Sequence, residues 1–221
     1  MNIIVIIPAR KSSKRLKNKN ILKINGISLI NRSLNFAKKI KFAKKIIITT
    51  DILSEDKTFK NKKIIFIKRP KVLAGDKSKI YKTAIYVSKY LKRNFNLKFD
   101  SFLMLQPTSP FRSLNIINKA YKEYKINKKK YSIASVCRGF KIHNRIFIIK
   151  NKKLVLKSKI DSNFKENYFV NGNFYFASLQ FINKYRSFVY EKKTIPFIFK
   201  NKKLSIDIDT RKDYLLAKKM A

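Results

Sequence analysis

Hydrophobic positions in the first half of the chain alternate between short continuous runs and longer segments with helical spacing. Residues 3–7 are all apolar and Pro8 closes the run, as expected for a parallel strand buried on both faces. In residues 80–91, apolar side chains recur on one face of a helix. The same patterns predict strands at 45–50, 64–67 and 102–105, and helices at 29–40 and 113–124 with Ser113 as a possible N-cap. Alternating strands and helices predict an α/β fold with right-handed crossovers.

The second half of the chain is less regular and richer in strands. Its patterns predict strands at 131–136, 146–149, 154–156, 174–177 and 204–208, and a final helix at 211–219. No internal repeat and no Pro/Gly/Ser-rich linker divides the sequence. We therefore expect one domain over residues 1–221, a three-layer α/β/α arrangement with a mostly parallel sheet, and a small strand-rich excursion at residues 138–170.

Charge is the dominant feature of the composition. The 221 residues include 54 Lys and Arg against 12 Asp and Glu, a formal net charge of +42. Such an excess is typical of proteins that bind nucleic acid or anionic membranes. Lys outnumbers Arg 44 to 10 and is spread along the whole chain, whereas phosphate and base recognition favours the planar fork of Arg. We therefore favour compositional drift, and keep a non-enzymatic nucleic-acid-binding protein as the alternative.

Cysteine usage and hydropathy predict the cellular location. Cys137 is the single cysteine, so no intramolecular disulfide is possible, which fits a reducing compartment. The apolar run at residues 3–7 is too short for a signal peptide or a membrane span, and no later stretch reaches 18 apolar residues without a charge. We expect a soluble, cytoplasmic protein.

Four segments follow predicted strands, where ligands bind in open α/β sheets: residues 8–20, 69–76, 106–112 and 207–209. The first holds six cations in thirteen residues. Such a loop could neutralise a triphosphate, although it lacks the Walker pattern GxxxxGK[ST]. In a chain this rich in lysine, a solvated basic loop is the equally simple alternative.

Two of the few acidic residues, Asp207 and Asp209, are spaced i, i+2. On a strand this spacing puts both carboxylates on one face, with Ile206 and Ile208 on the other. Converging carboxylates near a triphosphate suit Mg²⁺, a hard cation that takes oxygen ligands. Ordinary alternation in an edge strand is the other interpretation.

Five blocks of sequence resemble the N-acylneuraminate cytidylyltransferases (CMP-sialic acid synthetases), in the family's order. They lie at residues 6–30, which include IIPAR, KNI and NGISLI, at RP and LAGD in 69–76, at LQPTSPFR in 105–112, at NGNFY in 171–175, and at SIDIDT in 205–210. The third and last blocks together are specific. The resemblance implies a Rossmann-like nucleotidyltransferase fold and, through the 138–170 excursion, a homodimer. The sister enzymes that activate Kdo resemble the opening only.

The resemblance also implies a reaction, in which CMP passes from CTP to the anomeric hydroxyl of a sialic-acid-like nonulosonic acid and pyrophosphate leaves. Its CTP contacts fall on Arg10, Ser13, Lys19, Asn20 and Arg69. Lys19 and Arg10 would stabilise the charge on the phosphates, and Asp207 and Asp209 would hold Mg²⁺, with Asp209 catalytic. Legionaminic, pseudaminic or Kdo-type acids are alternative substrates.

The sugar contacts implied by the resemblance fall on Gln106, Thr108, Ser109, Asn171, Tyr175 and Phe188. The amide of Gln106 both donates and accepts hydrogen bonds, which suits a polyhydroxy sugar or its N-acyl group. Tyr175 and Phe188 could equally belong to the core. Prolines beside Thr108 and Ser109 also favour a simple rigid turn.

Two departures from the family pattern bear on activity. Lys11-Ser12 replaces a glycine-rich turn, so we expect the backbone to approach phosphates less freely. Residues 160–162 (IDS) replace an Arg-Arg-Gln motif whose arginine holds the sugar carboxylate in the family. Candidate substitutes are Lys157, Lys159 and Lys165, although Lys is a poor bidentate partner. The sole histidine, His143, is assigned no catalytic role.

Overall fold

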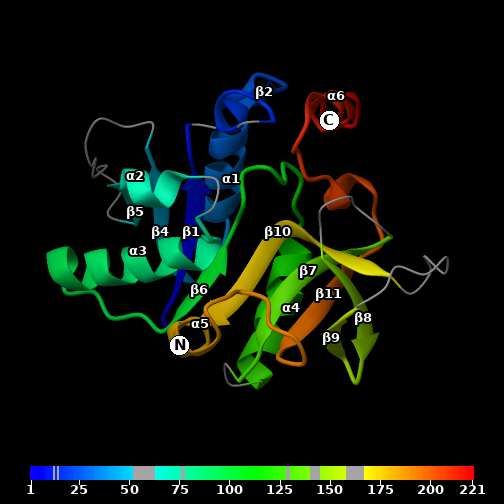
Figure 1. Ribbon diagram of the computed structural model, residues 1–221. Helices are drawn as coiled ribbons and strands as arrows, with labels where there is room; N and C mark the ends of the chain where they lie inside the picture. The colour runs from blue at the N-terminus through cyan, green and yellow to red at the C-terminus, as the bar shows by residue number, and fades with distance from the viewer. Residues whose placement is uncertain are drawn as a thin grey trace.

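A computed structural model describes residues 1–11, 13, 15–51, 63–75, 78–127, 130–139, 145–157 and 167–221. Its main sheet has the strand order β11-β7-β10-β6-β1-β4-β5, with β8 and β9 attached beside β10 (Figure 1). The strands are β1 (Ile3–Ala9), β4 (Ala43–Thr50), β5 (Ile64–Lys68), β6 (Ser101–Met104), β7 (Ser132–Arg138), β8 (Ile146–Lys150), β9 (Lys153–Leu156), β10 (Tyr168–Ser178) and β11 (Thr194–Phe199). Within the seven-strand path, β10 runs antiparallel to both neighbours and the other pairs are parallel. The sheet is therefore mostly parallel, as predicted.

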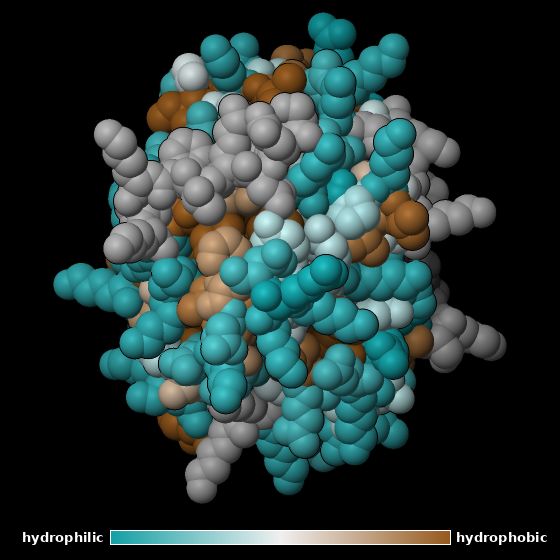
Figure 2. Space-filling model, turned by 90° about the vertical axis from the view of Figure 1, so that its left-hand side faces the viewer, coloured by the Kyte–Doolittle hydropathy of each residue, from teal (hydrophilic) through white to brown (hydrophobic). Residues whose placement is uncertain are grey.

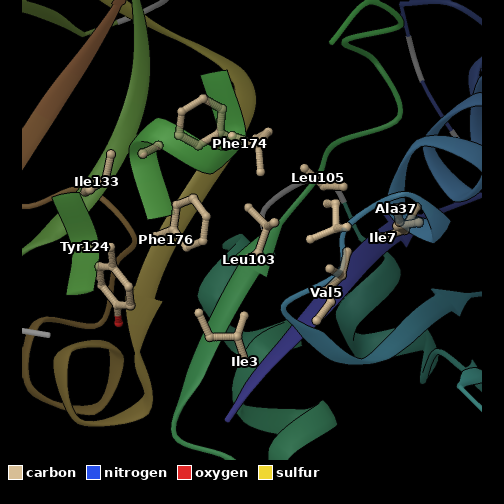
Figure 3. Close-up of a cluster of buried hydrophobic side chains, with 14 of the residues drawn as sticks. Ile3, Val5, Ile7, Ala37, Leu103, Leu105, Tyr124, Ile133, Phe174 and Phe176 are labelled. Carbon is tan, nitrogen blue, oxygen red and sulfur yellow. The ribbon is translucent and has the colours of Figure 1, made fainter. Parts of the chain in front are cut away.

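Helices cover both faces of this sheet, which gives the three predicted layers. They are α1 (Leu29–Lys38), α2 (Lys71–Ala74), α3 (Ile80–Phe95), α4 (Leu114–Ile126), α5 (Leu179–Tyr185) and α6 (Arg211–Lys219). On β1, Ile3, Val5 and Ile7 point to the face covered by α1 and α4 (Figure 3). Ile4 and Ile6 point to the opposite face, covered by α3 and α5. Alternate side chains of β1 thus belong to two hydrophobic cores, one on each face of the sheet.

Side-chain caps define where several helices begin. The hydroxyls of Ser28, Ser113 and Ser178 accept hydrogen bonds from backbone amides in the first turns of α1, α4 and α5. Thr210 and Asp213 form a reciprocal capping box at the start of α6. The predicted N-cap at Ser113 is confirmed, and the box at α6 fixes the chain directly after Asp209.

The strand predicted at residues 204–208 is wrong. A short 3-10 helix, η3 (Lys203–Ser205), occupies its beginning, and residues 206–209 belong to no helix or strand. The strand at that end of the sheet is β11 instead, which the prediction missed because Pro196 interrupts the pattern. β11 lies at the edge of the strand path, where a missing N–H is tolerated.

The predicted excursion corresponds in part to the hairpin of β8 and β9. Residues 140–144 and 158–166 lie outside the described ranges, and with them His143, Lys159, Lys165 and the segment that replaces the Arg-Arg-Gln motif. In the described part of the chain, no helix combines the length and the apolar character needed to cross a membrane.

Candidate active site

The four segments predicted to carry chemistry converge at one edge of the sheet. They line a cleft of about 350 Å³ at the carboxyl ends of β1, β5 and β6. We call it the polar cleft; its polar and small side chains come from Arg10, Ser13, Arg15, Lys19, Asn20, Arg69, Gly75, Ser78, Thr83, Gln106, Thr108, Gly172, Tyr175, Asp207 and Asp209. The convergence follows from the topology, because parallel strands present their carboxyl ends at the same edge. Four cations face two carboxylates here, so the described cleft attracts anions.

The basic loop is folded back on itself. Asn18 adopts a left-handed conformation (φ 54°) that begins the short 3-10 helix η1 (Lys19–Ile21). The Asn20 amide donates a hydrogen bond of 2.8 Å to the carbonyl of Arg10, which fixes both ends of the loop. Lys19 is only 9% exposed, although it carries a charge. The loop is therefore a built part of the cleft, and the interpretation as a merely solvated loop fails at Lys19.

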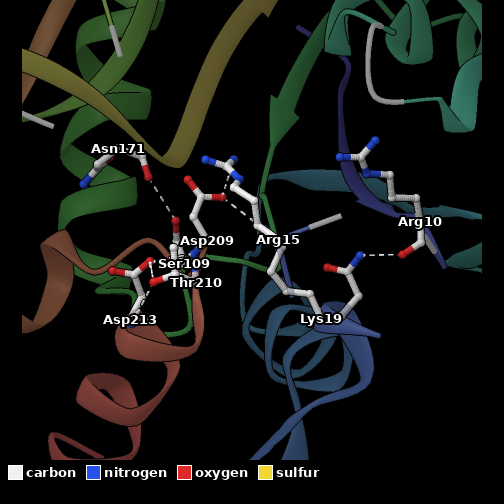
Figure 4. Close-up of polar contacts among 9 residues, drawn as sticks. Arg10, Arg15, Lys19, Ser109, Asn171, Asp209, Thr210 and Asp213 are labelled. Atoms are coloured by element: carbon white, nitrogen blue, oxygen red, sulfur yellow. Dashed lines mark hydrogen bonds and ion pairs between the residues drawn. The ribbon is translucent and has the colours of Figure 1, made fainter. Parts of the chain in front are cut away.

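Asp209 is the centre of the charge network in the cleft. Its Oδ1 lies 3.0 Å from Lys19 Nζ and 3.1 Å from Arg15 Nη2 (Figure 4). The backbone amide of Asp209 donates to Asp213 Oδ2 at 3.0 Å, which ties the carboxylate to the capping box of α6. Both cations come from the first loop. Lys19 and Asp209 are 190 residues apart in the sequence.

Asp207 and Asp209 face the cleft without the predicted strand. Burial alternates along residues 206–209, so Ile206 and Ile208 are buried while both aspartates line the cleft. Ile206 and Ile208 are buried in a small core with α6, and the Ile208 amide donates to the carbonyl of Thr108 at 2.8 Å. The pairing of carboxylates was thus predicted correctly, and its secondary structure was not.

Arg69 forms the buried wall of the cleft on the β5 side. The residue is 7% exposed, and its Nε donates to Thr49 Oγ1 at 3.5 Å. Its buried Nη2 has no hydrogen-bond partner among the described residues. Burial lowers the pKa of Arg69 to about 10, with Asp51 raising it and Arg10 lowering it further. The side chain remains a cation at neutral pH, and an anion in the cleft would satisfy the orphaned donor.

Gln106 and Gly172 meet at the far wall. Gly172 has a φ of +76°, and a Cβ built there would collide with Gln106 Oε1. The positive φ therefore favours glycine at this position of β10, and the missing side chain leaves space for the Gln106 amide. Both residues belong to motifs in the sequence, but only the structure shows that they lie against each other.

Arg112, at the end of the LQPTSPFR run, stabilises this wall through hydrogen bonds. Its guanidinium donates to the carbonyl of Gln106, to the carbonyl of Asn173 at 3.3 Å and to Ser33 Oγ at 3.1 Å. Burial lowers the pKa of Arg112 to about 9, so it stays charged at neutral pH. One cation thus joins β10, α1 and the turn after β6.

Three of the predicted sugar contacts do not line the polar cleft. Ser109 is fully buried and donates to the carbonyl of Asn171 at 3.2 Å. The Asn171 side chain accepts from Ser135 Oγ at 2.6 Å and donates to Cys137 Sγ at 3.1 Å. Phe188 is 2% exposed and packs its ring 5.7 Å from that of Tyr175. These residues support the wall, whereas Gln106, Thr108 and Tyr175 form its surface.

A second cavity of about 660 Å³ adjoins the polar cleft. It is lined by Arg145, Phe147, Leu156, Val170, Tyr175, Ser187, Val189, Tyr190, Glu191 and Lys192. Val170 and Tyr175 belong to both spaces. Burial raises the pKa of Tyr175, and the charge of Asp207 adds to the effect. The site thus joins a strongly polar compartment to a larger one of mixed character.

Comparison with known proteins decides the family. A family model described as Cytidylyltransferase matches residues 4–220. The chain belongs to the cytidylyltransferase family. This membership confirms the resemblance seen in the sequence and identifies a nucleotidyltransferase. It also decides against the non-enzymatic nucleic-acid-binding alternative. On the face of this cytidylyltransferase shown in Figure 2, hydrophilic side chains are spread widely between hydrophobic ones.

Two relatives share about a third of the sequence. The CMP-N,N'-diacetyllegionaminic acid synthase of Legionella pneumophila is 31% identical over 100% of this chain and 96% of its own length. The N-acylneuraminate cytidylyltransferase of Escherichia coli O18:K1:H7 is also 31% identical, over 97% of this chain. The match covers 51% of that relative, so the chain spans about half its length.

Solved structures agree on the fold. CMP:2-keto-3-deoxy-manno-octonic acid synthetase complexed with CTP matches with a TM-score of 0.69 over 100% of this chain and 98% of that chain, at 12% identity. A putative glucose-1-phosphate thymidylyltransferase from Bacillus anthracis matches with a TM-score of 0.68 over 99% and 95%, at 16% identity. At these identities the comparison establishes the nucleotidyltransferase fold alone.

Proposed function

We propose that this cytidylyltransferase transfers CMP from CTP to the anomeric hydroxyl of a nonulosonic acid and releases pyrophosphate. The observation that supports this most is the junction of two compartments at Tyr175. The polar cleft, with four cations among its described residues, suits a triphosphate. The second cavity is larger and mixes apolar walls with Arg145, Glu191 and Lys192, which suits a nine-carbon acid with N-acyl groups.

The triphosphate end of CTP would lie between the first loop and Arg69. Arg10, Lys19 and Arg69 line the cleft with positive charge, and Ser13 and Asn20 add polar groups to its lining. Lys19 is nearly buried, so its charge acts in a poorly solvated environment where electrostatic stabilisation is strong. We propose that Lys19 stabilises the charge that develops on the α-phosphate and pyrophosphate as the bond between them breaks.

The carboxylates of Asp207 and Asp209 fit a divalent cation such as Mg²⁺. They are hard oxygen ligands that line the same cleft, and Mg²⁺ in nucleotide sites takes one or two carboxylates together with phosphates and water. When bound, the ion would neutralise phosphate charge. Asp207 and Asp209 would position the ion, because the capping box of α6 and the buried Ile208 hold residues 207–209 in place.

The sugar would meet the α-phosphate at the wall formed by Gln106, Gly172 and Tyr175. Gln106 lines the cleft, and its amide lies against Gly172. We propose that this amide binds a sugar hydroxyl or N-acyl group. Ser109, Asn171 and Phe188 act behind the surface by fixing the turn and the ring of Tyr175.

The relatives are named for different sugar acids, so more than one is a candidate substrate. At the same 31% identity, one is named for diacetyllegionaminic acid and the other for N-acylneuraminate. A pseudaminic acid cytidylyltransferase of Campylobacter jejuni is 26% identical over 99% of this chain. We propose a nonulosonic acid as the substrate class, a cytoplasmic location and a homodimer through the β8–β9 region.

The test is release of pyrophosphate from each nucleoside triphosphate with Mg²⁺ and a panel of sialic, legionaminic, pseudaminic and Kdo acids. We expect CTP to be used well above ATP, GTP and UTP, and at least one nonulosonic acid to be preferred over Kdo. Calorimetry should show saturable binding of CTP. Equal affinity for all triphosphates would reduce the cleft to generic phosphate attraction and overturn the proposal.

A further inference from the structure

Arg15 and Lys19 both contact the same carboxylate oxygen. Arg15 Nη2 lies 3.1 Å and Lys19 Nζ lies 3.0 Å from Asp209 Oδ1. The three side chains differ in exposure, with 57% for Arg15, 17% for Asp209 and 11% for Lys19. Lys19 is therefore held in place by its surroundings, whereas Arg15 reaches the pair from the rim with most of its side chain in solvent.

In this arrangement Asp209 is already paired with two cations, which opposes the binding of a divalent cation proposed for it. A divalent cation at this carboxylate would stand beside two positive groups that already occupy one of its oxygens, and like charges at such distances repel. The nearly buried Lys19 has little freedom to withdraw. Arg15 has both the freedom and an alternative partner, since it also lines the cleft proposed for the triphosphate.

We propose that Arg15 is a further phosphate-binding residue, which pairs with Asp209 in the free protein and moves to the triphosphate when nucleotide and metal bind. A guanidinium exchanges one oxyanion for another readily, because carboxylate and phosphate accept the same bidentate geometry. The free-energy cost of breaking the Arg15–Asp209 contact is then shared between the nucleotide and the cation. Each ligand removes the obstacle for the other, so nucleotide and divalent cation bind cooperatively.

The inference rests on the proposed function, because it assumes that a nucleotide and a cation share this cleft. Its test uses Mn²⁺ in place of Mg²⁺ and measures free Mn²⁺ by electron paramagnetic resonance, without and with saturating CTP and with no sugar present. CTP binding is measured in parallel by calorimetry in a metal chelator. The variants are Arg15→Gln and the control Lys17→Gln, an exposed cation of the same loop that does not line the cleft.

Arg15→Gln should tighten Mn²⁺ binding to the nucleotide-free protein by about two- to fivefold, as expected for removal of one partly exposed ion pair. It should also weaken CTP binding and reduce the factor by which CTP strengthens Mn²⁺ binding. Lys17→Gln should leave that factor unchanged. Arg15→Lys, which keeps the charge but loses the planar fork, should retain weak Mn²⁺ binding in the free protein and lose part of the CTP affinity.

Equal changes in Arg15→Gln and Lys17→Gln would mean that only net charge matters, and would overturn the inference. An unchanged coupling factor in Arg15→Gln would do the same. These outcomes are separable from failure of the proposed function. If the unsubstituted protein binds no CTP saturably, the function fails, whereas normal CTP binding with no effect at Arg15 contradicts only the exchange.

Discussion

Gly172→Ala should damage catalysis through the Gln106 amide rather than through the backbone alone. Two penalties are expected from the geometry. A left-handed φ of +76° is unfavourable for alanine by roughly 1–2 kcal/mol. In addition, the new Cβ would collide with Gln106 Oε1, so the amide must leave its position. Loss of a neutral hydrogen bond to substrate is worth about 1 kcal/mol, and we expect kcat/KM for the sugar acid to fall by about fivefold.

The chain offers a matched control for the backbone penalty. Gly26 has a φ of +74°, and a Cβ built there meets nothing within 4 Å. Gly26→Ala should therefore lower the unfolding free energy by a similar 1–2 kcal/mol and leave kcat/KM almost unchanged. The comparison separates strain in the turn from displacement of Gln106.

The assay combines urea unfolding, CTP calorimetry and steady-state kinetics with the sugar acid. In a Gln106→Ala background, Gly172→Ala should add little further loss of kcat/KM, because the displaced amide is already gone. The reasoning is refuted if Gly172→Ala and Gly26→Ala have the same kinetic effect, or if the loss at Gly172 persists undiminished when Gln106 is alanine.

Three further substitutions test other parts of the site. Asp209→Asn should reduce kcat by a factor on the order of 10² or more without loss of folding by circular dichroism; normal turnover at saturating Mg²⁺ would refute the metal assignment. Lys19→Ala should lower kcat at least about tenfold more than Lys17→Ala, or roughly 1.4 kcal/mol, and equal small losses would contradict its catalytic role. Arg112→Met should lower the unfolding free energy by about 3 kcal/mol in urea titrations because three acceptors lose their donor, with Arg112→Lys intermediate; an unchanged midpoint would refute the stabilising role of Arg112.

The arrangement of the polar cleft was predictable because it depends on topology. Once residues 3–7, 64–67 and 102–105 are identified as parallel strands, their following loops must meet at one edge. The carboxylate pair was predictable for a different reason. Alternation of buried isoleucines with aspartates places both acids on one side of any extended chain, whether or not it is paired in a sheet.

What the sequence could not show depends on contacts between distant segments. Ser109 and Asn171 are polar residues in motifs, but they satisfy one another and Ser135 inside the wall. A buried polar side chain and a ligand-binding one look identical in sequence, since both need hydrogen-bond partners. Phe188 was open to both interpretations, and its 2% exposure beside Tyr175 places it in the core.

In a lysine-rich sequence, composition does not distinguish the cations of the cleft from solvated ones, whereas burial and ion pairing in the structure do. Among the described basic residues, Lys19 and Arg69 are buried, with 9% and 7% exposure, and Arg69 Nη2 is one of the buried nitrogens without a hydrogen-bond partner. Arg15 differs in sharing an oxygen with Lys19. A solvated lysine is screened and contributes little, whereas a cation in the cleft acts at short range on a poorly solvated anion. The net charge of the chain is therefore a poor guide to its chemistry, which we expect to depend on the few cations that the fold places in the cleft.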